Sequence, residues 1–205
     1  MQILSNIFLL VQIFACIAAL FFWKQYKHTP LWIFLPYLIY TVLNELTATV
    51  MVWNEVKNVR ILYNVYCAVS FGVYLYFFDQ LIKLKFWKWL ILLGFVIVIL
   101  TDIFQRDVTS QLIKNSLLFL AILLFIFSLI YFIKLLNSKE VIHYQKIPEF
   151  WIIFGILVFH IAFIPLSLVS GSGYNIQLSY SIVILILNYL MYSCYIYGFY
   201  VAGKR

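Results

Sequence analysis

The residues most able to do chemistry in this chain stand inside apolar sequence. Glu45 lies in the stretch YLIYTVLNELTATV, where Tyr37, Thr41 and Asn44 precede it at helical spacing. Residues three or four apart share one face of a helix, so these side chains are expected to share a face that looks into a bundle. A carboxylate inside a bilayer is costly and is a functional hypothesis by default. Two interpretations stay open: Glu45 lines a pocket or ion path, or it is a protonated or hydrogen-bonded tie between helices.

Four more polar residues, Gln12, Asn64, His160 and Asn188, fall at a similar depth in other apolar runs. Asn64 is expected either to hydrogen-bond between helices, the favoured interpretation, or to pair with Glu45. A histidine in mid-membrane suits proton transfer or ligand binding, although a lone one is more often a packing residue. The shared depth predicts one outward-facing polar cavity that contains Glu45 and at least one of Asn64, His160 and Asn188. The alternative is a set of separate interhelical hydrogen bonds.

Two further stripes of polar residues follow helical spacing. One contains Tyr63, Cys67, Ser70 and Tyr74, and the other contains Ser181, Asn188, Tyr192 and Tyr195. Nearer the ends of their runs, Asp79 and Asp102 are expected to form helix-spaced surface ion pairs, Asp79 with Lys83 or Lys85 and Asp102 with Arg106.

Catalysis has no support in the residue pattern. A membrane zinc enzyme needs several His and Asp ligands, and His160 is the one histidine at membrane depth. The serines Ser167 and Ser170 have no evident base to activate them. The sequence therefore predicts a protein that is not an enzyme, with no metal and no cofactor.

The elements that must position these residues are membrane-spanning helices. Two thirds of the chain (66%) is apolar and 10% is charged, and the charges fall almost wholly between the apolar runs. A spanning helix needs about 20 apolar residues, so about seven spans use the whole chain. The result is an all-α polytopic bundle of seven transmembrane helices that forms one domain, 1–205. The predicted spans are 3–23, 31–53, 61–82, 86–105, 114–136, 150–170 and 178–201.

Basic residues set the orientation of the bundle. Ten of them fall in the loops that follow the odd spans and four fall on the other side. An excess of Lys and Arg marks the cytoplasmic face. We therefore expect the N-terminus outside, the C-terminus in the cytoplasm, the loop 171–177 outside and an inner-membrane location. The same charges are explained by the lipid bilayer, so no direct nucleic-acid binding is expected.

Several motifs resemble a family. LNELT late in the second span, ILYN opening the third, FFDQLIK closing it and IPEFWIIFGIL opening the sixth resemble small, largely uncharacterised heptahelical membrane proteins of Bacteroidetes type. The size and apolar character also resemble membrane accessory proteins of RNA-targeting CRISPR loci. Neither resemblance implies an enzyme or assigns a functional residue.

Two functions remain in competition. The first is a non-enzymatic sensor or accessory protein that binds a ligand or partner through an outer polar pocket and acts with a separate cytoplasmic protein. The second is a small transporter or channel with a proton- or ion-coupling polar core, which an oligomer could form. A polar track that reaches both faces favours the second function, and a pocket closed at the cytoplasmic end favours the first.

Overall fold

The computed structural model describes residues 2–56, 58–105, 107–109, 111–169 and 177–204, and the regular structure within these ranges is helical. The α-helices are α1 (Gln2–Phe21), α2 (Trp23–Tyr26), α3 (Phe34–Trp53), α4 (Arg60–Ile82), α5 (Trp87–Gln105), α6 (Lys114–Leu136), α7 (Pro148–Val169) and α8 (Gln177–Gly203). Two 3₁₀ segments, η1 (Pro30–Ile33) and η2 (Lys139–Lys146), lead into α3 and α7. The predicted loop 171–177 lies outside the described residues, apart from Gln177.

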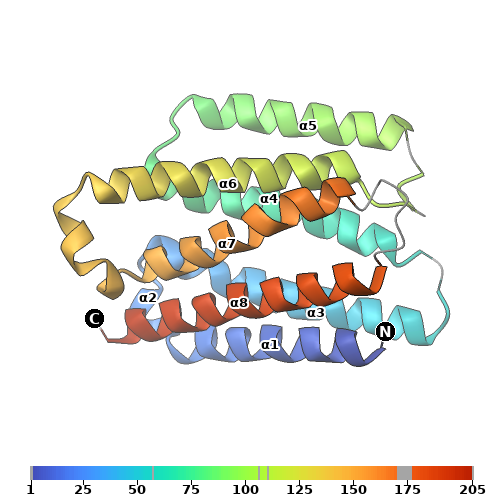
Figure 1. The fold of residues 1–205 in the computed structure, drawn as a ribbon, viewed down its shortest axis with the longest axis horizontal. Helices are drawn as coiled ribbons and strands as arrows, with labels where there is room; N and C mark the ends of the chain where they lie inside the picture. The colour runs from blue at the N-terminus through green and yellow to red at the C-terminus, as the bar shows by residue number, and fades with distance from the viewer. Residues whose placement is uncertain (1, 57, 106, 110, 170–176, 205) are drawn as a thin grey trace.

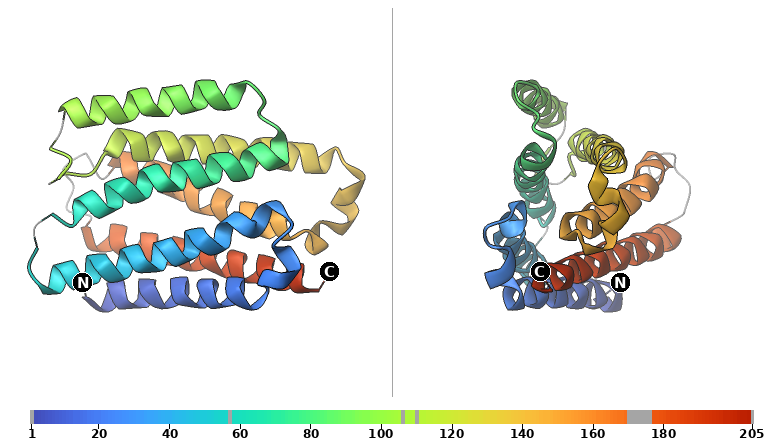
Figure 2. Two further views of the ribbon diagram at one scale, coloured as in Figure 1. Left: turned by 180° about the vertical axis from the view of Figure 1, so that it is seen from behind. Right: turned by 90° about the vertical axis from the view of Figure 1, so that its left-hand side faces the viewer.

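The long helices run side by side along one axis (Figure 1). Neighbouring helices make a ring in the order α1, α3, α4, α6, α7 and α8, and α8 closes the ring against α1. Helix α5 packs on α6 and stands at the outer edge of the bundle (Figure 2). The centre of the ring is therefore bordered by α3, α4 and α8, which carry most of the polar stripes predicted from the sequence.

Six helices are long and apolar enough to cross a membrane, and α1 adds a shorter apolar stretch, Leu9–Phe21. Large apolar side chains cover their outward faces, including Phe14, Leu43, Val65, Leu93 and Ile126. An apolar surface that covers a whole bundle is unfavourable in water, whereas the hydrocarbon core of a membrane accommodates it. The chain is a multi-pass membrane protein, and the seventh span and the orientation stay predictions.

One end of the bundle holds the final residues of α4, α6 and α8 together with η1 and η2, and we call it the Lys-rich end. Asp79 lies here, and its carboxylate accepts from Lys88 Nζ at 3.0 Å and from Leu84 N at 3.1 Å. The predicted pairing of Asp79 with Lys83 or Lys85 is wrong. The reason is that α4 ends at Ile82 and both lysines have positive φ, so the helical spacing is broken.

Asp102 lies at the opposite end and is fully buried, so the predicted surface ion pair is wrong for its location; Arg106 lies outside the described residues. One carboxylate oxygen accepts from Ser116 N and Ser116 Oγ, both at 2.8 Å, and the other accepts from Asn115 Nδ2 at 2.8 Å. The first turn of a helix has N–H groups without intrahelical partners. Asp102 of α5 therefore caps the start of α6, where a negative charge also suits the helix dipole.

Helices α7 and α8 approach each other closely at glycines. A Cβ added at Gly155 would stand 2.8 Å from Cys194 Cβ and 3.0 Å from Met191 O. A Cβ added at Gly198 would stand 2.9 Å from Ile152 Cγ1. Small residues permit such backbone approach between membrane helices, where packing rather than water drives association.

Candidate functional site

Hydroxyl groups from α3, α4 and α8 meet in the centre of the bundle. The Tyr37 hydroxyl lies 2.7 Å from the Tyr66 hydroxyl and 3.0 Å from Ser70 Oγ. The Tyr74 and Tyr195 hydroxyls are 3.0 Å apart, and the Tyr37 and Tyr74 rings meet edge to face with centroids 5.5 Å apart. These five residues form a continuous set that we call the tyrosine network.

Glu45 lies beside this network and is half-buried. The Tyr63 hydroxyl of α4 donates to Glu45 Oε2 at 3.3 Å, which is long for a hydroxyl–carboxylate hydrogen bond. Tyr192 of α8 lies within hydrogen-bonding reach of the Tyr66 and Gln12 side chains and close enough to Glu45 for a charge interaction. The expectation that Glu45 faces protein is met, because its carboxylate contacts α4 and lies near α8.

Gln12 of α1 completes the group. Its side chain is 3% exposed, and its Oε1 has no hydrogen-bond partner among the described residues. A buried acceptor without a donor is uncommon and calls for an explanation such as a water or a ligand. Together, Gln12, Glu45, Tyr63, Tyr66 and Tyr192 are called the Glu45 cluster below.

Towards the Lys-rich end the tyrosine network meets an aromatic layer. It consists of four aromatic residues and one leucine, all fully buried: Tyr26, Leu31, Phe34, Phe77 and Phe199. The Phe34 ring contacts Phe77 at 4.8 Å and Tyr195 at 5.4 Å between centroids. Tyr26 stacks on Phe199, and its hydroxyl donates to a backbone carbonyl of α1, 2.7 Å away. Burial raises the pKa of Tyr26, so its phenol stays neutral and the layer carries no charge.

Asn64 does not pair with Glu45. Its Nδ2 donates to the carbonyls of Val108 and Gln111 at 2.8 and 2.9 Å, and its Oδ1 accepts from Ile113 N at 3.1 Å. These contacts hold the segment before α6 against α4. Asn64 is therefore a hydrogen-bonding tie, as the favoured interpretation expected, but it joins α4 to the segment before α6 rather than to a second helix.

His160 and Asn188 bond mainly within their own helices. His160 Nδ1 lies 2.7 Å from the Ile156 carbonyl, and its ring packs against Phe159. Asn188 Nδ2 donates to the Ile184 carbonyl at 2.8 Å. Both are buried, as is Asn44 on the predicted face of α3. These bonds are consistent with packing residues, and no contact joins either His160 or Asn188 to Glu45 in the described structure.

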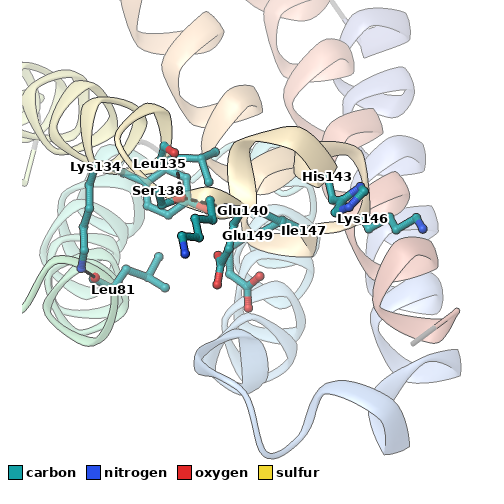
Figure 3. Close-up of a pocket in the computed structure, with 11 residues that line it drawn as sticks. Leu81, Lys134, Leu135, Ser138, Glu140, His143, Lys146, Ile147 and Glu149 are labelled. Atoms are coloured by element: carbon teal, nitrogen blue, oxygen red, sulfur yellow. Dashed lines mark hydrogen bonds between the residues drawn. The ribbon is translucent and has the colours of Figure 1, made fainter.

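A pocket of about 750 Å³ lies at the Lys-rich end, between the ends of α4 and α6, η2 and the start of α7. In Figure 3, Lys134 extends towards Leu81, and its Nζ donates to that carbonyl at 2.7 Å. Glu140 and Glu149 line the same pocket (Figure 3). The described residues contain no group of three or more His, Cys, Asp or Glu that could hold a metal. Because both lysines and glutamates line it, the pocket carries groups of both charges.

Sequence reasoning found Glu45, Gln12 and both polar stripes but missed Tyr66 and the pocket at the Lys-rich end. Tyr66 stands four residues before Ser70, so helical spacing could have placed it beside the predicted stripe. The pocket joins residues from separate parts of the chain and leaves no local signal.

No protein-family model, curated protein or solved structure matches this chain. The resemblance to small heptahelical membrane proteins therefore stays a prediction, and the function is argued from the cluster alone.

Proposed function

We propose that this protein is a non-enzymatic sensor or accessory protein of the inner membrane. It binds a ligand or partner at the Glu45 cluster, from outside, and acts with a separate protein at its Lys-rich, cytoplasmic end. The observation that carries the proposal is the asymmetry of the bundle centre. Among the described residues, one end holds the Glu45 carboxylate, with one long hydrogen bond, and the buried, unpaired Gln12 Oε1, whereas uncharged aromatic rings fill the centre towards the other end. Such a centre suits recognition from one side more than passage between two sides.

A small transporter or channel is the second candidate. It is supported by the tyrosine network, because linked hydroxyls extend the polar groups of Glu45 some way along α4. From Tyr63 to Tyr74 the helix rises about 16 Å, roughly half of the hydrocarbon core. A transporter would also need the aromatic layer to open, since Phe34 and Phe77 now fill the path.

Thiol labelling separates the two functions. In a background that lacks Cys16, Cys67 and Cys194, we would place single cysteines by Glu45→Cys, Ser70→Cys and Lys139→Cys. A membrane-impermeant reagent should label Glu45→Cys only from outside and Lys139→Cys only from the cytoplasm. Labelling of Ser70→Cys from the cytoplasm would contradict the closed layer and support transport, and labelling of Lys139→Cys from outside would reverse the orientation.

A further inference from the structure

The Glu45 cluster presents two acceptors that the described residues do not fully satisfy. Among these residues, the carboxylate of Glu45 receives one long hydrogen bond, from Tyr63 at 3.3 Å. No Lys or Arg among the described residues forms an ion pair with Glu45. Gln12 Oε1 is buried and has no partner in the same part of the chain. A carboxylate with one long hydrogen bond and an amide oxygen without a donor can both accept from a ligand that is rich in N–H groups.

Aromatic rings stand around these acceptors. Tyr66 stacks on Tyr37 and on Tyr40, with centroids 6.0 and 6.1 Å away. Tyr192 lies near Glu45 and Tyr66, and its ring is edge to face with Tyr195. The faces of tyrosine rings attract cations, and the attraction grows when water is excluded.

Charge decides between ligand classes. An anion would meet the carboxylate of Glu45 without a described cation to offset the repulsion. A neutral ligand without N–H or O–H groups would leave both acceptors unmet, and a neutral ligand with such groups would leave the charge of an ionised Glu45 without a counter-charge. A cation satisfies the acceptors and also offsets the cost of an ionised carboxylate in the membrane.

We propose that the Glu45 cluster is a binding site for an organic cation, namely a primary or quaternary ammonium ion, whose ammonium group lies between the Glu45 carboxylate and Gln12 Oε1 and near the Tyr66 and Tyr192 rings. This inference rests on the proposed function, because it names the class of ligand that the outer site takes. Glu45 supplies the charge, Gln12 selects for N–H groups, and the tyrosine rings favour a positive group of either primary or quaternary type.

The test measures binding to the full-length protein in lipid nanodiscs, from the shift in the thermal unfolding midpoint as the probe concentration rises. The probes are n-butylammonium, tetramethylammonium, 1-butanol and butanoate. We expect both cations to raise the midpoint, with apparent affinity at least tenfold weaker in Glu45→Gln. The matched control, Glu55→Gln, removes an exposed carboxylate near the same end and should bind like the unmodified protein. Equal affinity in Glu45→Gln and the unmodified protein would overturn the proposal.

Gln12→Leu provides a second variant that keeps the carboxylate. This substitution should lower the apparent affinity for n-butylammonium at least threefold and leave that for tetramethylammonium unchanged, because only n-butylammonium has N–H groups to donate. Binding of 1-butanol or butanoate in preference to both cations would refute the ligand class. It would leave the proposed function standing if the binding still depended on Gln12. Failure of the outside labelling of Glu45→Cys would instead remove the proposed function itself.

Discussion

Replacing Asp102 by alanine should destabilise the bundle through the start of α6. From the described residues, the carboxylate accepts hydrogen bonds of 2.8 Å from Asn115 Nδ2, Ser116 N and Ser116 Oγ, and it is fully buried. Hydrogen bonds to charged groups contribute about 1.5–3 kcal/mol each, but Asn115 is exposed and can turn to other partners. The two Ser116 groups are buried and cannot. We therefore expect a loss of about 3 kcal/mol in the free energy of unfolding, within the range for a lost buried network.

Thermal or denaturant unfolding of the detergent-purified protein measures this loss. Asp102→Asn keeps an acceptor in the same place, so it should lose only about 1 kcal/mol. Thr101→Val is the neighbouring control, since Thr101 is exposed and its hydroxyl donates only to the Val98 carbonyl of its own helix. It should change stability by less than about 0.5 kcal/mol. If Asp102→Ala were no less stable than Thr101→Val, the capping of α6 by α5 would be refuted.

Three further substitutions test other contacts by the same unfolding measurement. Asn64→Ala removes three hydrogen bonds to the segment before α6 and should cost about 2 kcal/mol; an unchanged midpoint would contradict that role. Gly155→Ala pushes a methyl group towards Cys194 and should cost about 1–3 kcal/mol, whereas Gly72→Ala, with open space around it, should be neutral or slightly stabilising; equal effects would refute the close α7–α8 packing. A double-mutant cycle of Tyr74→Phe and Tyr195→Phe should give a coupling of about 0.6 kcal/mol, and zero coupling would argue against their hydrogen bond.

The helices were predictable because apolar runs and flanking charges carry the signal locally. The predicted span 61–82 compares with Arg60–Ile82, and 114–136 agrees with Lys114–Leu136. The direction in which Glu45 points was also predictable, since helical spacing with Tyr37 and Thr41 defines a face.

The partners of the polar residues were not predictable, because they depend on how helices distant in the sequence meet. Asn64 was close to Glu45 along the chain, yet its amide bonds the segment at Val108–Ile113. Asp102 accepts from the Ser116 N–H of α6, a partner that helical spacing within α5 does not reveal. Both sets of contacts include backbone N–H or carbonyl groups, which exist in nearly every residue and leave no mark in the sequence.

The close packing of α7 on α8 has a mechanical consequence. Where Gly155 stands against the α8 backbone, the two helices are too close to approach further without steric overlap, so we expect the pair to move together. The opposite side of α8 meets the rest of the bundle partly through tyrosine hydroxyls, such as Tyr195 with Tyr74. Hydroxyl groups rotate and exchange partners without large side-chain displacement. If α7 and α8 move together relative to the rest of the bundle, we therefore expect the change in contacts to occur at the tyrosines between α8 and α4.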